Sequence, residues 1–181
     1  RRVEFIRDAL VGVDTELRAL ARSYGVEGVR LFVRHDDARV AVPALARSLR
    51  VQAVFLAHDD EPFALERDAH VRGALAAHGI AMHSSKDHVI FERDEVLTGS
   101  GTPYTVFTPY RRSWMAKLDD FFLSSYPVAR HADALAPPPA DVRVALACGE
   151  ATGVPTLEQS GFEPTNLHEL KLRPGPAGGR E

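Results

Sequence analysis

The sequence predicts an α/β fold, a Rossmann-like parallel sheet with helices on both faces. Three short apolar runs, at residues 29–33, 53–57 and 80–83, have the composition of β-strands. Stretches whose apolar residues recur at helical spacing separate these runs. An alternation of helix and strand favours right-handed crossovers between parallel strands.

The first part of the chain predicts two helices around one strand. An amphipathic helix is expected over residues 2–22, with Gly25 ending it and a strand at 29–33 following it. A second helix is expected over residues 40–49, with Pro43 in its first turn, where a missing N–H costs nothing.

The middle of the chain predicts the centre of the sheet. The run AVFLA at 53–57 is wholly apolar, as in a strand covered on both faces. A helix over 63–78, closed by Gly79, then leads to the strand at 80–83.

After residue 84 the pattern becomes irregular. We expect a short extended piece at 89–91, a structured turn at 98–103 and a helix over 108–125. The prolines at 136–140 indicate an extended linker, and 174–179 is too rich in Pro and Gly to pack. The expected domains are therefore residues 1–125, an α/β domain, and residues 126–181, an irregular linker.

Composition excludes several classes of protein. The net charge is −3, so no overall basic field attracts phosphate backbones. A single cysteine, Cys148, excludes an internal disulfide and a multi-cysteine zinc site. The sequence has no apolar run long enough for a membrane span and no signal peptide, so we expect no membrane partner and a cytoplasmic location.

No local cluster establishes a reaction by itself. The acidic loop at 58–61 follows a predicted strand, where open α/β sheets bind ligands, but its acids also suit helix capping more than cation binding. His78, His83 and His88 are spaced irregularly and predict scattered polar residues rather than a metal triad. The Gly-Ser-Gly turn at 99–101 has neither a nucleophile elbow nor a phosphate-loop frame.

Two separated motifs carry a family resemblance. The stretch 86–118, KDHVIFERDEVLTGSGTPYTVFTPYRRSWMAKL, and the earlier pattern of Asp59, Glu61-Pro62-Phe63 and Arg67-Asp68 occur in the order found in DNA photolyases and cryptochromes. The chain resembles the N-terminal α/β domain of that family over nearly its whole length. In this family two further strands precede the helix with which the chain opens, and a helical domain would begin beyond Glu181, so we expect the domain to be incomplete at both ends.

The resemblance implies light-dependent repair of ultraviolet-induced pyrimidine dimers in DNA. Reduced FAD, excited by blue light, passes an electron to the dimer and takes it back after the ring opens. FAD and damaged DNA would be held by the helical domain, so this chain has no assigned catalytic residue. Two alternatives stay open: a cryptochrome-type photoreceptor, and a free-standing nucleotide-binding or pigment-binding module of the same α/β ancestry. The resemblance also implies a monomer.

The same resemblance implies an antenna chromophore that passes excitation energy to FAD. Asp87 and the loop residues Ser100, Gly101 and Thr102 match segments that border its pocket. Folate-binding members carry a carboxylate near the place of Thr102, so a deazaflavin or flavin antenna, or none, is favoured over folate. The alternative is that Asp87 only bonds loop amides and the glycines only permit the turn.

Overall fold

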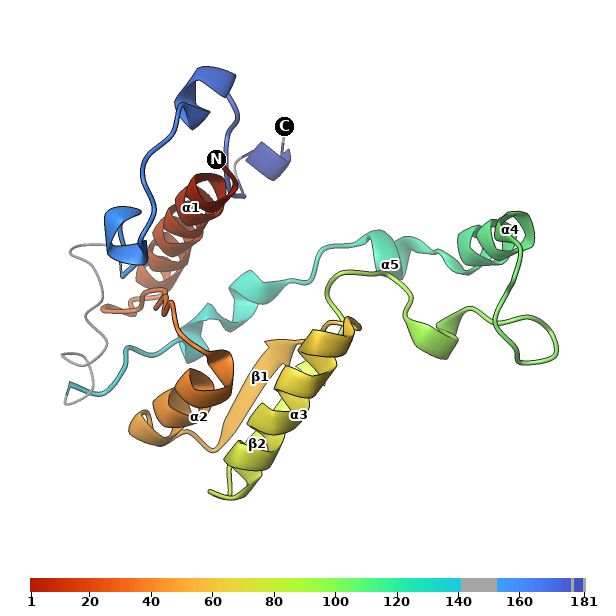
Figure 1. Ribbon diagram of the computed structural model, residues 1–181, viewed down its shortest axis with the longest axis horizontal. Helices are drawn as coiled ribbons and strands as arrows, with labels where there is room; N and C mark the ends of the chain where they lie inside the picture. Colours follow the sequence, from red (N-terminus) through yellow and green to blue (C-terminus); the bar gives the residue numbers. More distant parts are fainter. Residues whose placement is uncertain (141–152, 177, 181) are drawn as a thin grey trace. The chain divides into compact units, whose positions relative to one another are not determined.

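The chain forms two compact units, shown in the computed structural model of Figure 1, which describes residues 1–140, 153–176 and 178–180. One unit comprises residues 1–37 and 127–181, and the other residues 38–126. The helices and strands are α1 (Arg2–Ser23), α2 (Ala38–Ser48), β1 (Ala53–Ala57), α3 (Pro62–Ala76), β2 (Ala81–Ser85), α4 (Phe107–Lys117) and α5 (Asp120–Leu123). Short 3₁₀ turns are η1 (Arg93–Glu95), η2 (Val128–Ala134), η3 (Glu158–Ser160), η4 (Leu167–Leu170) and η5 (Gly178–Arg180).

Strands β1 and β2 form a parallel pair, which confirms the predicted α/β class. Ala53 lies opposite Ala81, and the register continues to Ala57 opposite Ser85. Helix α3 connects the two strands and packs against α2 and β2 (Figure 1). Its C-terminal turn ends at Gly79 with φ +70°, as predicted, because glycine adopts the left-handed region without penalty.

The core of this unit lies between the helices and one face of the sheet. Val54 and Leu56 of β1 pack against it, whereas Phe55, on the opposite face, is 77% exposed and stacks on His83 with ring centroids 4.8 Å apart. The alternation follows from the two-residue period of a strand. The buried core residues are Ala46, Val71, Leu75, Ile80 and Met82.

The predicted strand at 29–33 is wrong for the structure as described, since these residues belong to no sheet. A strand is defined by a ladder with a neighbour, and here the backbone donors find other acceptors. The Leu31 N–H donates to Oδ1 of Asp14 at 2.7 Å, and the Val33 N–H donates to the Gly153 carbonyl at 3.3 Å.

Two helix predictions also need correction. Helix α2 begins at Ala38, so Pro43 lies beyond the first turn, in the helix interior, where its ring is buried. The helix expected over 108–125 is two helices, because Leu118 leaves the helical region at ψ 123°. Asp119 then caps α5, with its Oδ1 accepting the Phe121 N–H at 2.9 Å. In the extended piece expected at 89–91, residues 90 and 91 form a bend, and these residues belong to no strand.

Segments of residues 153–176 contact α1, although 126–181 is expected to be a linker. The Thr165 N–H donates to Oε2 of Glu4 at 3.1 Å, and the Thr165 hydroxyl donates to the same oxygen. Gly175 approaches α1 so closely that a Cβ there would lie 3.2 Å from the Ala9 carbonyl oxygen. This part of 174–179 therefore packs, contrary to expectation; the proposed boundary at residue 125 stays a prediction, and Cys148 lies outside the described residues.

Candidate functional site at the strand ends

The carboxyl ends of β1 and β2 open into two cavities that share one wall. His58, Asp59 and Asp60 follow β1, and Lys86, Asp87 and His88 follow β2. The smaller cavity, about 200 Å³, is lined by these six residues with Val89 and Glu92. Parallel strands place their C-terminal ends at one edge of the sheet, where open α/β folds bind ligands.

Aromatic side chains line the second cavity, which measures about 450 Å³. Its wall of residues 86–89 is shared with the smaller cavity, and Phe121, Phe122 and Tyr126 come from α5 and the residues after it. Phe121 and Tyr126 are largely exposed. A cavity with several aromatic faces and a few polar groups suits a planar heteroaromatic ligand.

A polar network fixes the loop that carries Asp87. His58 Nε2 lies 2.6 Å from Oε2 of Glu92, which joins the end of β1 to the loop after β2. Glu92 and Glu95 form a reciprocal capping box around η1. Lys86 Nζ donates to Oε2 of Glu95 at 2.5 Å, and Lys117 donates to the Glu95 carbonyl. The loop is thereby tied to β1, to η1 and to α4.

The hydrogen bond from Lys86 lowers the pKa of the Glu95 carboxyl below its ordinary value, and a further hydrogen bond from the Glu92 backbone lowers it more. Donors to the ionised carboxylate stabilise the charged form. Glu95 therefore stays an acceptor for both partners at neutral pH.

Phe91, in the same loop, packs against aromatic side chains of α4 and α5. It is buried, with Trp114 at 5.5 Å and Phe122 at 4.7 Å between ring centroids, both in edge-to-face geometry. Lys117 Nζ lies 5.1 Å from the centroid of the Phe91 ring. Phe91 thereby contacts both Trp114 of α4 and Phe122 of α5, across the break between the two helices.

The predicted site residues divide into two groups. Asp87 lines both cavities, and in the part of the chain that the structure describes its carboxylate makes no hydrogen bond or ion pair. Ser100, Gly101 and Thr102 are not among the lining residues of either cavity.

The turn at 98–102 is closed by its own hydrogen bonds. Thr98 Oγ1 lies 3.0 Å from Ser100 Oγ and 2.8 Å from Thr102 Oγ1. Gly101 supplies φ +77°. The glycine thus permits the turn, as the simpler sequence interpretation holds.

Sequence reasoning missed the His58–Glu92 pair and the aromatic wall. The E-x-x-E spacing of Glu92 and Glu95 is a capping-box signal that could have located η1. No sequence signal pairs His58 with Glu92, because their contact depends on a separation of 34 residues.

Comparison with known proteins decides the family. The family model for DNA photolyase matches residues 3–138, three quarters of the chain. The chain belongs to the DNA photolyase family. Proteins of this family in general use a flavin and an antenna chromophore and act on damaged DNA.

Photolyases are among the similar proteins. A deoxyribodipyrimidine photo-lyase of Halobacterium salinarum is 33% identical over 89% of this chain, and one of Synechococcus is 32% identical over 81%. Cryptochrome-1 of Rattus norvegicus is only 24% identical, over 92% of the chain. The chain spans 30% and 29% of the lengths of the two photolyases.

The described residues bear on three points: a membrane-spanning helix, a metal site and the fit of an antenna chromophore. In the described residues, no helix is long and apolar enough to cross a membrane, and no three potential metal ligands lie together. The Asp87 carboxylate beside an aromatic cavity fits a planar pigment that offers a hydrogen-bond donor, so the residues present are compatible with an antenna chromophore.

Proposed function

We propose that this chain is the pigment-bearing α/β part of a deoxyribodipyrimidine photolyase. The whole protein repairs ultraviolet-induced pyrimidine dimers in DNA by electron transfer from photoexcited reduced FAD. The match of the DNA photolyase family model over residues 3–138 is the observation that carries this proposal. No residue of this chain is assigned to the electron transfer itself.

The part played by these residues is to hold and orient an antenna pigment, which when bound absorbs light and passes its excitation to FAD. Asp87 accepts a hydrogen bond from a polar edge of the pigment, and Phe121, Phe122 and Tyr126 contact its ring faces. The His58–Glu92 contact and the Lys86–Glu95 pair keep Asp87 in place. Ser100, Gly101 and Thr102 form a self-closed turn outside the lining of both cavities, so no contact with the pigment is assigned to them.

Any pigment bound here is a deazaflavin or a flavin rather than folate. Thr102 offers a hydroxyl where folate-binding relatives offer a carboxylate, and that hydroxyl already contacts Thr98. The Asp87 carboxylate is an acceptor only, so it selects a pigment edge with an N–H or O–H group.

Repair is tested on the full-length protein with reduced FAD and ultraviolet-irradiated oligothymidylate. We expect dimers to revert under blue light but not in the dark, as followed by the recovery of absorbance of the thymine bases. A protein that carries FAD and absorbs blue light but leaves the dimers intact would contradict the repair proposal and favour a cryptochrome-type photoreceptor.

The antenna is tested separately, by the absorption spectrum of pigment released from the native full-length protein. We expect a deazaflavin or flavin spectrum, and Asp87→Asn should reduce pigment content about tenfold, since hydrogen bonds to charged groups contribute about 1.5–3 kcal/mol. Asp94→Asn, on the exposed 3₁₀ turn, is the matched control and should keep its pigment. A folate spectrum, or equal loss in both variants, would contradict this assignment.

A further inference from the structure

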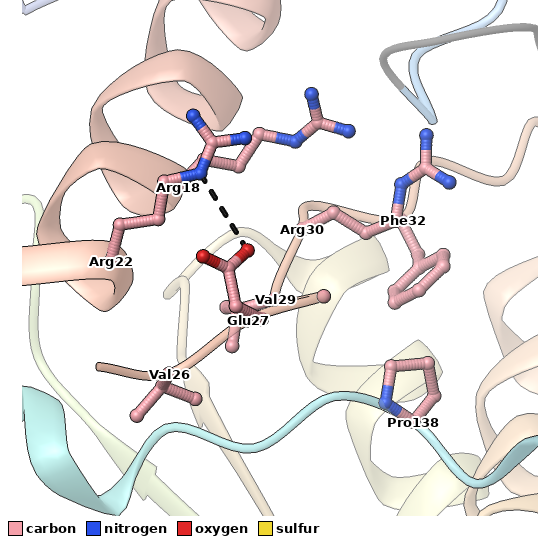
Figure 2. Close-up of a pocket in the computed structure, with 9 residues that line it drawn as sticks. Arg18, Arg22, Val26, Glu27, Val29, Arg30, Phe32 and Pro138 are labelled. Carbon is pink, nitrogen blue, oxygen red and sulfur yellow. Dashed lines mark ion pairs between the residues drawn. The ribbon is translucent and has the colours of Figure 1, made fainter. Parts of the chain in front are cut away.

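A pocket rich in arginine lies in the unit of residues 1–37 and 127–181, and it shares no residue with the cavities at Asp87. Its volume is about 320 Å³, and Arg18, Arg22, Arg30 and Glu27 supply the charged groups of its lining. Figure 2 shows the three arginine side chains around the pocket, with the Glu27 carboxylate below the guanidinium of Arg22. Phe32 and Pro138 add apolar surface to the lining (Figure 2).

Contacts with the chain itself orient two of these arginines. Arg18 Nε lies 3.3 Å from Oδ2 of Asp14, whose side chain is almost fully buried and whose other oxygen accepts the Leu31 N–H. The Arg30 guanidinium carbon lies 6.0 Å from the centroid of the Phe32 ring. Guanidinium groups that are already oriented lose less conformational entropy when they bind a ligand.

The third arginine is held more loosely. Arg22 Nε lies 3.8 Å from Oε2 of Glu27, and both side chains are mostly exposed. Such a long, solvated ion pair contributes little to stability, so its guanidinium can turn to a stronger acceptor at small cost.

The charge of the pocket selects its ligand. Among the described residues of the lining, three arginines stand against Glu27, and the buried Asp14 lies beside Arg18. The macrodipole of α1 favours a cation at Arg22, in the last turn of the helix. Several guanidinium groups around one concave surface match the geometry of phosphate oxygens, which accept paired N–H bonds.

We propose that this pocket binds a phosphate group of a small molecule. Arg22 and Arg30 donate to the phosphate oxygens, and Arg18 adds positive charge from its fixed position on Asp14. The site is independent of the antenna and of the repair reaction.

The test is a calorimetric titration of the full-length protein with inorganic pyrophosphate at constant ionic strength. We expect saturable binding that weakens at least about tenfold in Arg22→Gln/Arg30→Gln, because the variant removes two charge-assisted hydrogen bonds to the phosphate oxygens. Arg18 is left intact, because its replacement would remove the ion pair with the buried carboxylate of Asp14.

Arg2→Gln/Arg47→Gln is the control, because it removes the same charge at two exposed positions outside the pocket. It should bind pyrophosphate within about twofold of the native protein, since screened charges at a distance contribute little. Circular dichroism verifies that each variant is folded. Absence of saturable binding to the native protein, or equal weakening in both double variants, would overturn the proposal.

Discussion

His58 Nε2 and Glu92 Oε2 lie 2.6 Å apart, and this contact joins the end of β1 to the loop that carries Asp87. Both side chains are largely shielded from water, with 15% and 21% of their surfaces exposed. Glu92 also takes part in the capping box of η1. One carboxylate therefore links the sheet edge to the first turn after the candidate pigment loop.

Removing that carboxylate should loosen the loop. We expect Glu92→Ala to lower the free energy of unfolding by about 1–2 kcal/mol, because it removes a shielded hydrogen bond to His58 and a cap. Glu92→Gln should cost less, since the amide oxygen still accepts. Urea unfolding followed by Trp114 fluorescence measures both variants. Glu66→Ala, on the exposed surface of α3, is the control, and an equal loss there would refute a special role for Glu92.

The Lys86–Glu95 pair should make stability depend on pH at the acid end. The pKa of Glu95 is lowered in the folded state from 4.5, so the unfolded chain takes up this proton more readily. The stabilisation is present above the unfolded pKa and is lost as the pH falls through the lower folded pKa.

This dependence is measured as the melting temperature of native protein and Lys86→Met between about pH 3 and pH 7. The native protein should melt higher near neutrality, and the difference should shrink in acid, below the ordinary pKa of 4.5. A difference that stays constant over the whole range would show that the pair does not act through the Glu95 charge.

The order of elements could be predicted from sequence because it depends on local pattern. The bounds of α1, α3, β1 and the turn at Gly79 follow from spacing and glycine chemistry within a few residues. The run at 29–33 could not be assigned correctly, because strand formation depends on a partner. Here Asp14 and Gly153 take its amide hydrogens instead.

The candidate site divides in the same way. Asp87 was predicted from the family resemblance of residues 86–118, and in the structure it lines two cavities. The aromatic wall from Phe121 to Tyr126 was missed, because the predicted single helix over 108–125 hid the break at Leu118. The break occurs where Asp119 caps the start of α5, and the spacing of apolar residues does not show such a cap.

The core of residues 38–126 should depend strongly on Leu75, whose side chain is fully buried among Val71, Ile80 and Met82. We expect Leu75→Ala to lower the free energy of unfolding by about 2–5 kcal/mol, through lost transfer energy and the cavity left behind. Leu65→Ala on the same helix, at a position that is 47% exposed, should cost less than about 1 kcal/mol. Chemical denaturation measures the free energy of unfolding of both variants. Similar losses in the two would contradict a central role for Leu75 in the core.

Gly153 should be intolerant of any side chain. Its φ is +71°, and a Cβ there would lie 2.5 Å from the Leu31 carbonyl oxygen, closer than van der Waals contact allows. The left-handed conformation alone costs alanine about 1–2 kcal/mol. Overlap with backbone should add about 1–3 kcal/mol, because the carbonyl cannot turn away as a flexible side chain would.

Gly161→Ala separates the two effects, since Gly161 has φ +79° and nothing within 4 Å of its Cβ position. Both variants carry the conformational strain, but only Gly153→Ala meets the carbonyl. Gly153→Ala should therefore expose the Val33 N–H, which donates to the Gly153 carbonyl, and speed its hydrogen exchange. If Gly161→Ala accelerates exchange at Val33 equally, the close approach of residues 31 and 153 does not hold this segment in place.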